Sequence, residues 1–362
     1  MKLIPQIRFK GFTDDWEERK SKELCTISTG KGNTQDKIDD GIYPFYVRSA
    51  TIEKSNDYLY DQEAVLTVGD GVGTGKVFHY VNGKYNLHQR VYRMYDFNYV
   101  SAKYFYYYFS NNFYKRVMSM TAKTSVDSVR MEMIADMNIV FPSVKEQEKI
   151  VALFSNLDDT IALHQRKLDL VKETKKGFLQ KMFPKNGEKV PELRFAGFVD
   201  DWEQRKFKDI LKTHSFRSYL AGVSENGEYE VIQQGDKPIV GYSDGEPFTD
   251  YKDVTLFGDH TVSLYKPKSP FFVATDGVKI LSADNFEGDY LYTTLERYKP
   301  KPQGYKRHFT ILKNQDVWFT KNMEEQQKIG SFFKQLDDTI TLHQRKLDLL
   351  KETKKGFLQK MF

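Results

Sequence analysis

The segment GDGVGTGK at residues 69–76 is the first place in the sequence where chemistry could be expected, because glycine-rich loops cradle phosphates. Its details do not fit a nucleotide site. A phosphate-binding loop needs a glycine where Asp70 stands and a serine or threonine where Val77 stands. Thr74 occupies the position of the third glycine in a dinucleotide-binding fingerprint. The segment therefore predicts a glycine-rich turn between strands, with a direct phosphate contact as the alternative.

The histidine, cysteine and acidic residues are not spaced as a catalytic or metal centre. The seven histidines are scattered, and the single cysteine, Cys25, excludes a cysteine cluster. Asp158-Asp159 and Asp337-Asp338 are adjacent pairs, and adjacent side chains on a helix point about 100° apart, which favours a solvated face over a metal site. The Pro-Pro-aromatic motif of amino-methyltransferases is also missing. We therefore expect no catalytic residue, no metal site and no cofactor in this chain.

Polar and basic side chains at several predicted turns are of the types that contact phosphates and base edges. In the first half of the chain these candidate DNA-binding residues are Arg48, Ser49, His88, Gln89, Arg90 and Lys123. In the second half they are Gln233, Gln234, Lys237, Lys301, Gln303, Tyr305, Lys306, Arg307 and His308. For each of them an ordinary solvated surface position is the alternative.

The net charge of +5 gives little reason by itself to predict nucleic-acid binding. Cys25–Lys145 contains 14 basic and 12 acidic residues, and Leu211–Glu324 contains 14 basic and 16 acidic residues. The remaining positive charge lies in the parts of the sequence that repeat. A basic surface would therefore have to arise from the placement of side chains in the fold.

The composition is typical of a globular protein with more than one domain. The chain has 362 residues, 40% of them apolar and 15% aromatic, which is long for a single core. It has no run of about 18 apolar residues that could span a membrane, and its first residues lack the apolar core of a signal peptide. A lone cysteine is typical of a reducing compartment. We therefore expect a cytoplasmic location.

One segment occurs twice almost unchanged. Asp158–Phe183 and Asp337–Phe362 differ at only two of 26 positions. A second segment, Pro5–Leu24, matches Pro191–Ile210 at 12 of 20 positions. The stretches between these segments show no visible alignment. The sequence therefore consists of a frame segment, an insert and a long repeated segment, followed by the same arrangement with a different insert.

Apolar residues in the long repeated segment recur at alternating intervals of three and four, which predicts a helix with a coiled-coil seam. In the first copy they are Ile150, Leu153, Leu157, Ile161, Leu168, Val171, Phe178 and Met182, with His164 and Lys175 filling two gaps. We expect His164 and its counterpart His343 to pack or hydrogen bond at a helix interface. A helix of about 38 residues, roughly 57 Å long, could not bury such a stripe alone. Antiparallel, pseudo-twofold pairing of the two copies is the simplest solution.

Each insert predicts a mixed α/β domain. In the first, strands are predicted in YPFYVRSA, EAVLTVG and KVFHYVNGKYNLHQRVYRM, with Asn82-Gly83 as a hairpin turn. The run YFYYYF at residues 104–109 has helical spacing, which favours a buried core over base stacking. In the second insert strands are predicted in EYEVIQQ, DVTLFGDHTVSLYK and SPFFVATDGVKILSA, with a turn at Asp276-Gly277.

This layout resembles the specificity subunit of type I restriction-modification systems. The likeness covers the whole chain and is carried by EQEKI at Glu146–Ile150, EQQKI at Glu325–Ile329 and the duplicated HQRKLDL segments. The inserts match the family only in size and coarse strand pattern, so no DNA contact is transferred residue by residue. The resemblance implies an α+β fold in which two α/β target-recognition domains are separated by two long antiparallel coiled-coil helices, with a pseudo-twofold internal repeat.

The expected domain boundaries follow the repeat. We predict target-recognition domains at residues 1–145 and 184–324, and spacer helices at residues 146–183 and 325–362. Because the inserts differ, the two domains should read an asymmetric, bipartite DNA site. Linking two reading modules at a fixed separation adds specificity that one module lacks.

The resemblance also implies partners. The subunit would bind double-stranded DNA and two modification (methyltransferase) subunits, which carry S-adenosylmethionine and methylate adenine. Motor-nuclease restriction subunits would use ATP and magnesium, whereas this chain would be non-catalytic and would contact no membrane. Two alternatives stay open. One is a coiled-coil scaffold that displays two protein-binding domains without touching DNA, and the other, which the missing motifs disfavour, is an enzyme with an unrecognised site.

Overall fold

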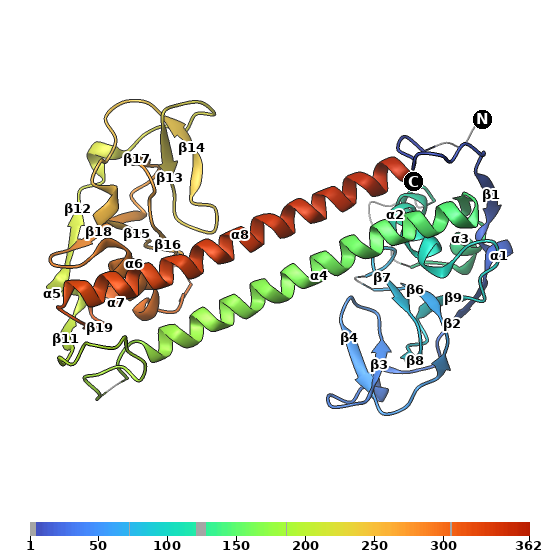
Figure 1. Ribbon diagram of the computed structural model, residues 1–362, viewed down its shortest axis with the longest axis horizontal. Coiled ribbons are helices and arrows are strands. Elements are labelled where there is room, and N and C mark those ends of the chain that lie inside the picture. Colours follow the sequence, from blue (N-terminus) through green and yellow to red (C-terminus); the bar gives the residue numbers. More distant parts are fainter. Residues whose placement is uncertain (1–4, 72, 121–127, 186, 305) are drawn as a thin grey trace. The chain divides into compact units, whose positions relative to one another are not determined.

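The computed structural model describes residues 5–71, 73–120, 128–185, 187–304 and 306–362 (Figure 1). Contacts within the chain divide it into two compact units. Unit 1 comprises Met1–His164 together with Lys346–Phe362, and unit 2 comprises Gln165–Arg345. Two long helices, α4 (Val144–Lys181) and α8 (Met323–Met361), each contribute one end to each unit.

The described part of unit 1 contains one strand pair and two four-stranded sheets. Strands β1 (Glu17–Lys20) and β10 (Asn138–Phe141) pair antiparallel. The first sheet is antiparallel, in the order β2 (Thr26–Thr29), β9 (Val91–Tyr95), β6 (Ala64–Val68) and β7 (Phe78–Val81). The second has the order β4 (Ile52–Ser55), β3 (Tyr43–Tyr46), β8 (Lys84–Leu87) and β5 (Tyr60–Asp61). The helices are α1 (Ser21–Leu24), the short η1 (Thr34–Asp36), α2 (Ala102–Ser119) and α3 (Met131–Ala135).

The described part of unit 2 is built in the same way. Strands β11 (Glu203–Lys206) and β19 (Asp316–Phe319) pair antiparallel. The first sheet has the order β12 (Leu211–His214), β18 (Val278–Ala283), β15 (Thr255–Gly258) and β16 (Leu264–Tyr265). The second has the order β14 (Ile239–Ser243), β13 (Tyr229–Ile232) and β17 (Phe271–Val273). The helices are α5 (Phe207–Ile210), η2 (Arg217–Tyr219), η3 (Tyr251–Asp253), α6 (Gly288–Tyr298) and α7 (His308–Lys313).

The two units therefore share a strand order in spite of their unlike inserts. The order β2-β9-β6-β7 corresponds to β12-β18-β15-β16, and β4-β3-β8 corresponds to β14-β13-β17. The pairs β3–β8 and β13–β17 are both parallel. The repeat visible in the sequence of the frames and long helices thus extends through the inserts. The sequences of the inserts do not reveal this repeat because different apolar residues can fill the same sheet positions.

The hairpin predicted at Asn82-Gly83 is wrong. Gly83 has a φ of +111°, a conformation that glycine adopts readily. The strands on either side of this turn nevertheless belong to different sheets, because β7 pairs with β6 whereas β8 pairs with β3 and β5. The turn passes the chain from one sheet to the other. An Asn-Gly pair favours a local reversal but does not choose the partner of the next strand.

An aromatic helix lies at the centre of the unit 1 core. Helix α2 packs against β6 and β7 (Figure 1), and Tyr104, Phe105 and Phe109 are fully buried. The interpretation of YFYYYF as core is therefore confirmed. In unit 2 the corresponding helix α6 packs against β15, β16 and β18 and buries Tyr290 and Leu291.

The long helices bury a wider apolar face than the predicted seam. Ile150 and Met182 are buried, as the seam predicts. Phe154 and its counterpart Phe333 lie outside the seam and are buried as well. The Phe154 ring centroid lies 5.1 Å from that of Tyr107 on α2. A helix that packs on both a second helix and a domain needs this broader apolar stripe.

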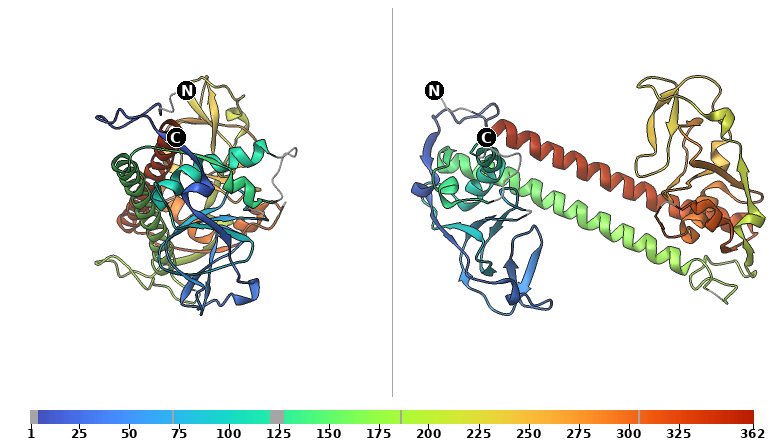
Figure 2. Two further views of the ribbon diagram at one scale, coloured as in Figure 1. Left: turned by 90° about the vertical axis from the view of Figure 1, so that its right-hand side faces the viewer. Right: turned by 180° about the vertical axis from the view of Figure 1, so that it is seen from behind.

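The C-terminal ends of both long helices pack into the cores. In unit 1 the ring centroid of Phe362 lies 5.6 Å from that of Tyr104 and 5.7 Å from that of Phe154. In unit 2 the ring centroid of the corresponding Phe183 lies 6.2 Å from that of Tyr290. Each unit therefore joins the start of one long helix to the end of the other, as two further views show (Figure 2).

Ion pairs at corresponding positions join the two long helices within each unit. In unit 1 Lys354 of α8 donates to Asp158 of α4. In unit 2 Lys175 of α4 donates to Asp337 of α8, with 2.6 Å between Nζ and Oδ1. Lys175 is only 6% exposed and also pairs with Glu296. The first aspartate of each adjacent pair thus lies at the helix interface and not on the solvated face that the sequence predicts.

A buried glutamate near the start of each long helix binds the frame segment. Glu146 accepts two hydrogen bonds from the guanidinium of Arg8, at 2.7 and 2.8 Å. Arg194 and Glu325 form the same two-bond pair in unit 2, at 2.6 and 2.9 Å. Both carboxylates are shielded from solvent, and the bond to Glu146 raises the pKa of Arg8. The EQEKI and EQQKI motifs therefore begin with a structural ion pair.

The glutamine after each glutamate extends the same attachment. The Gln147 amide donates to the carbonyl oxygens of Tyr99 and Pro142, at 2.9 and 3.0 Å, and accepts the backbone N–H of Ser101 at 3.1 Å. Ser101 is the N-cap of α2. Gln326 makes the same three bonds in unit 2, to Asn285, Thr320 and Glu287. One buried amide thus ties the start of the long helix to the start of the aromatic helix.

We expect Glu146→Ala to lower the free energy of unfolding by about 1–3 kcal/mol, because it leaves the half-buried guanidinium of Arg8 without its partner. Glu148→Ala is the matched control, since Glu148 lies on the exposed side of the same helical turn and should contribute less than about 0.5 kcal/mol. Urea denaturation followed by tryptophan fluorescence measures both. Equal losses in the two variants would contradict a special role for Glu146.

Candidate nucleic-acid interface

An ionic cluster around Asp70 brings together three segments that are far apart in the sequence. Asp70 follows strand β6, and its carboxylate oxygens lie 3.6 Å from Arg48 Nη1 and 3.8 Å from Arg90 Nε. The two arginine side chains are 50% and 66% exposed. We refer to Arg48, Asp70 and Arg90 as the unit 1 cluster. Two predicted DNA-binding arginines therefore share one carboxylate.

A buried histidine supports Arg90 from behind. His88 is buried, and its Nδ1 accepts the backbone N–H of Arg90 at 3.0 Å. Burial lowers the pKa of His88, and the neighbouring Arg48 lowers it further, so the ring is neutral at pH 7 and can accept this bond. Gln89 is exposed and donates to Asn33 Oδ1 at 2.9 Å. His88 therefore positions the backbone, whereas Gln89 and Arg90 present their side chains to solvent.

The glycine-rich segment connects β6 to β7, as the turn interpretation predicts. Gly71 and Gly75 have φ values of +87° and +68°, which other residues rarely adopt. A Cβ atom at Gly69 would lie 2.7 Å from the carbonyl oxygen of Arg90, so only glycine allows the two segments to approach this closely. The turn thereby places Asp70 beside the arginines.

Asp259 occupies the corresponding place in unit 2, directly after β15. It is only 4% exposed, and its Oδ1 accepts the backbone N–H of Phe309 at 2.9 Å, in the first turn of α7. Its backbone oxygen accepts the N–H of His308 at 2.8 Å. Lys279 Nζ lies 3.9 Å from its Oδ2. Asp259 therefore attaches α7 to the end of the sheet.

A hollow beside Asp259 collects cationic side chains of unit 2. Its lining includes Arg217, Lys279 and Arg307, together with His214 and Phe216. The sequence predicts Arg307 as a DNA-binding residue but not Arg217 or Lys279, because a lone cation in a turn or strand carries no signal of its own. The Gly-Asp pair that follows an apolar strand in both inserts is the signal that could have located the site.

The candidates Gln233, Gln234 and Lys237 are not part of the lining of this hollow, and they differ in their partners and exposure. Gln234 accepts the backbone N–H of His260 at 2.9 Å, next to Asp259. Gln233 donates to the backbone oxygen of Lys237 at 3.1 Å and so closes its own turn. Lys237 is exposed.

In unit 1, the candidate Ser49 is half-buried and donates its hydroxyl to a backbone oxygen within the same loop.

The basic segment at residues 299–309 contains both exposed and buried candidates. Lys301 and Arg307 are exposed, and exposed Lys306 donates to Gln303 Oε1 at 3.1 Å. His308 is fully buried, and its Nε2 accepts the backbone N–H of Gln303 at 2.8 Å. The ring of His308 therefore supports the segment and is not available to DNA, contrary to the prediction. The predicted contacts Lys123 and Tyr305 lie outside the described residues.

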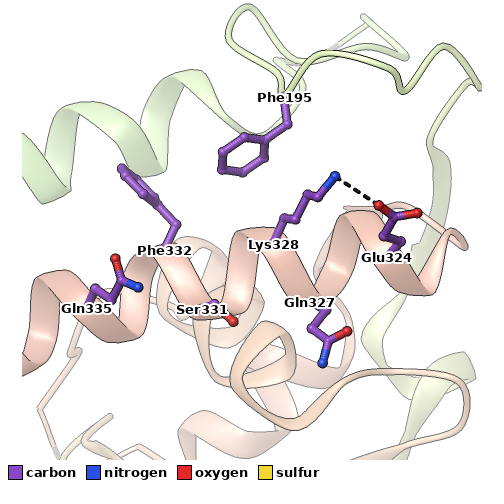
Figure 3. A pocket seen from close by; sticks show the side chains of 7 residues that line it. All are labelled: Phe195, Glu324, Gln327, Lys328, Ser331, Phe332 and Gln335. Atoms are coloured by element: carbon purple, nitrogen blue, oxygen red, sulfur yellow. Dashed lines mark ion pairs between the residues drawn. The ribbon is translucent and has the colours of Figure 1, made fainter.

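A second hollow of unit 2 lies between the frame segment and α8 (Figure 3). The rings of Phe195 and Phe332 line it from these two elements, as Figure 3 shows. Lys328 in its wall pairs with Glu324 at 2.9 Å, one helical turn away. Lys328 is the one basic residue of this lining, whereas Arg217, Lys279 and Arg307 line the hollow beside Asp259, so the second hollow is less suited to an anionic ligand.

Other chemistries find little support in the described ranges. Within them, no three His, Cys, Asp or Glu side chains are grouped so that they could hold a metal ion. No helix in the described part of the chain is both long and apolar enough to cross a membrane. Cys25 is buried, and burial raises the pKa of its thiol to about 12, so the thiolate nucleophile is scarce at neutral pH.

The chain is thus a duplicated α+β protein with a group of cationic side chains near the strand ends of each half. A family model described as "Type I restriction modification DNA specificity domain" matches residues 13–173 and 199–352, which include both halves. The chain belongs to this family.

Relatives and solved structures agree with this assignment. The specificity subunit of the type I restriction enzyme EcoDI from Escherichia coli is 28% identical over 184 residues, which is 50% of this chain and 40% of that protein. The MjaVIII specificity subunit from Methanocaldococcus jannaschii is 19% identical over 95% of this chain and 91% of its own length. The crystal structure of a type I restriction-modification S subunit from M. genitalium has the same fold, with a TM-score of 0.77 at 15% identity over 99% of both chains.

We expect Arg307→Ala to weaken duplex DNA binding by about 1–3 kcal/mol if the side chain contacts a base, with relaxed choice at one position. Lys208→Ala is the control, because Lys208 is an exposed cation of the same unit on α5, outside the hollow, and should matter by less than about 0.5 kcal/mol. Fluorescence anisotropy with labelled duplexes measures both. A loss for Arg307→Ala no larger than that of the control would remove the hollow from the interface.

Proposed function

We propose that this chain is the DNA-recognition subunit of a type I restriction-modification complex and that it directs adenine methylation and restriction by its partner subunits. The single observation that carries this proposal is the match of the DNA specificity family model to both halves of the chain. The cationic sites at Asp70 and Asp259 supply groups of the kind that bind phosphates and base edges. A scaffold that binds only proteins would not need them.

Each unit reads one half of a bipartite, asymmetric site in this proposal. The unit 1 cluster is an open ionic group, whereas the unit 2 site is a hollow beside a buried aspartate. The same fold thus presents different side chains at corresponding positions, as two different half-sites require. The candidates Arg48, Gln89, Arg90, Gln234, Lys301 and Arg307 stay proposals for these contacts.

The two long helices act as antiparallel, pseudo-twofold spacers in this proposal. Its support is the reciprocity of the contacts between them: the aspartate of one repeat pairs with the lysine of the other in both units, as Asp158–Lys354 and Asp337–Lys175. Reciprocal contacts of this kind are typical of a twofold interface. The spacers correspond to α4 and α8, and the target-recognition domains to the residues that precede each of them.

The partners follow from the same family. Two modification subunits would bind the duplicated parts of the chain, which offer each of them the same residues. They would carry S-adenosylmethionine, and the restriction subunits would use ATP and magnesium, so that this chain itself is non-catalytic and holds no cofactor. The cytoplasmic location expected from the sequence stays a prediction.

A domain exchange tests the function. Replacement of residues 211–324 by the second insert of another family member should change one half of the methylated DNA sequence and leave the other half unchanged, because the first insert is untouched. Methylation maps of cells that carry the partner subunits and either chain measure this. A change in both halves, or in neither, would contradict the assignment of one half-site to each unit.

The spacer proposal makes a separate prediction. Four residues added near Leu157–Ile161, about one helical turn, lengthen α4 by about 6 Å. At about 3.4 Å per base pair, the unread gap in the DNA site should grow by one or two base pairs while both half-sites keep their bases. The position matters because the apolar stripe already has a four-residue step there, so the insertion keeps its register. An unchanged gap in the methylation map would show that the helix does not set it.

A further inference from the structure

The unit 1 cluster contains a carboxylate at a place where affinity for DNA would be higher without one. Arg48 and Arg90 each attract phosphate, whereas Asp70 between them repels it. The separations of 3.6 and 3.8 Å exceed those of a hydrogen bond, so Asp70 holds both guanidinium groups by charge without fixing them rigidly. Its Oδ1 is shielded from solvent and has no hydrogen-bond donor among the described residues. The Asp70 carboxylate therefore lowers the affinity for phosphate and leaves one oxygen without a hydrogen bond. A residue with these two disadvantages should have a structural or functional role.

Among the residues that the structure describes, we find no structural role that needs the Asp70 carboxylate. Backbone bonds already anchor the turn, because Gly69 donates to the oxygen of Arg90 at 2.8 Å and accepts the N–H of Val129 at 2.7 Å. In unit 2 the corresponding Asp259 is buried and accepts the N–H of Phe309 in α7. The Asp70 carboxylate accepts no comparable bond from the described residues. The two aspartates share a place in the repeat, but within the described ranges the Asp259 carboxylate holds a helix whereas that of Asp70 accepts no hydrogen bond.

We propose that Asp70 is a specificity-determining residue of unit 1, which restrains Arg48 and Arg90 from binding phosphates on any DNA and reserves them for the base edges of the correct half-site. This inference rests on the proposed function. Asp70 acts as a positioning residue for the two arginines, and no direct contact with DNA is required of it. Its charge reduces the cluster from two net positive charges to one.

The geometry explains how selection would arise. A phosphate group that approaches either arginine meets the charge of Asp70, which is 28% exposed, at the same surface. A guanine edge carries neutral acceptors and is not repelled in this way, so both arginines can turn to it. His88 keeps the backbone of Arg90 fixed during this exchange. The result is weaker binding to random DNA and a larger ratio of specific to non-specific affinity.

The test is Asp70→Asn in the full chain, with Asp259→Asn as the matched variant. Two labelled duplexes are used: the sequence that the wild-type chain directs to be methylated in cells, and a scrambled sequence of the same composition. We expect Asp70→Asn to tighten binding to the scrambled duplex. The slope of log K, the binding constant, against log salt concentration should become steeper by about 0.9, which is the contribution of one added phosphate contact. The ratio of specific to scrambled affinity should fall about fivefold or more, as for one lost base position.

Thermal unfolding separates this role from a structural one. Asp70→Asn should leave the unfolding temperature unchanged, whereas Asp259→Asn should lower it, because α7 loses its attachment to the sheet. An Asp70→Asn variant that is destabilised like Asp259→Asn, or whose salt slope and affinity ratio equal those of the wild type, overturns the inference. If the wild-type chain does not distinguish the two duplexes, the proposed function itself fails. If the wild-type chain distinguishes the two duplexes and the Asp70→Asn variant distinguishes them equally well, only the proposed role of Asp70 is wrong.

Discussion

The buried arginine–glutamate pair near the start of each long helix is the contact on which the rest of the structure depends. Glu146 holds Arg8 through two hydrogen bonds across 138 positions of sequence, and the adjacent Gln147 holds the N-cap of α2. Three elements are thereby fixed at one point: the frame segment, the aromatic helix and the long helix. Burial of an ion pair is unfavourable unless its geometry is satisfied, so this contact favours one register over all others. Its exact repetition at Arg194 and Glu325 gives two unlike inserts the same support.

Features that depend on local periodicity could be predicted from the sequence. The long helices and the aromatic core at residues 104–109 follow from spacing, because a period of three to four residues defines a helix face, and the duplicated frame follows from matching residues. Features set by tertiary partners could not. The turn at Asn82-Gly83 indicates a reversal but not the sheet that receives the next strand. The burial of Phe154 could not be predicted from the coiled-coil seam, because this residue packs on Tyr107 of helix α2 and lies outside the stripe that faces the second long helix.

The residues of the candidate site also include some that could be predicted from the sequence and some whose placement could not. Residue type alone indicated Arg48, Arg90 and Arg307, since guanidinium groups suit phosphates and guanine edges. That two of them meet at Asp70, and that His308 is enclosed, follows from strand order and not from neighbouring residues. Sheets accept many apolar sequences at the same positions, and the turns at their ends are free to vary. This freedom explains how one architecture carries an open ionic cluster in one half and a hollow in the other.

The contribution of Phe362 and its neighbours to unit 1 has a consequence for synthesis of the chain. Unit 2 is continuous in sequence from Gln165 to Arg345, so every residue of its core emerges from the ribosome before Lys346–Phe362 does. Residues Met1–His164 of unit 1 are made early, but the unit lacks the end of α8 until Lys346–Phe362 appears. Domains usually fold in the order of synthesis, from the N-terminus onward. Here the unit that starts first is completed last, and Tyr104 and Phe154 lack their contact with Phe362 while unit 2 is being made.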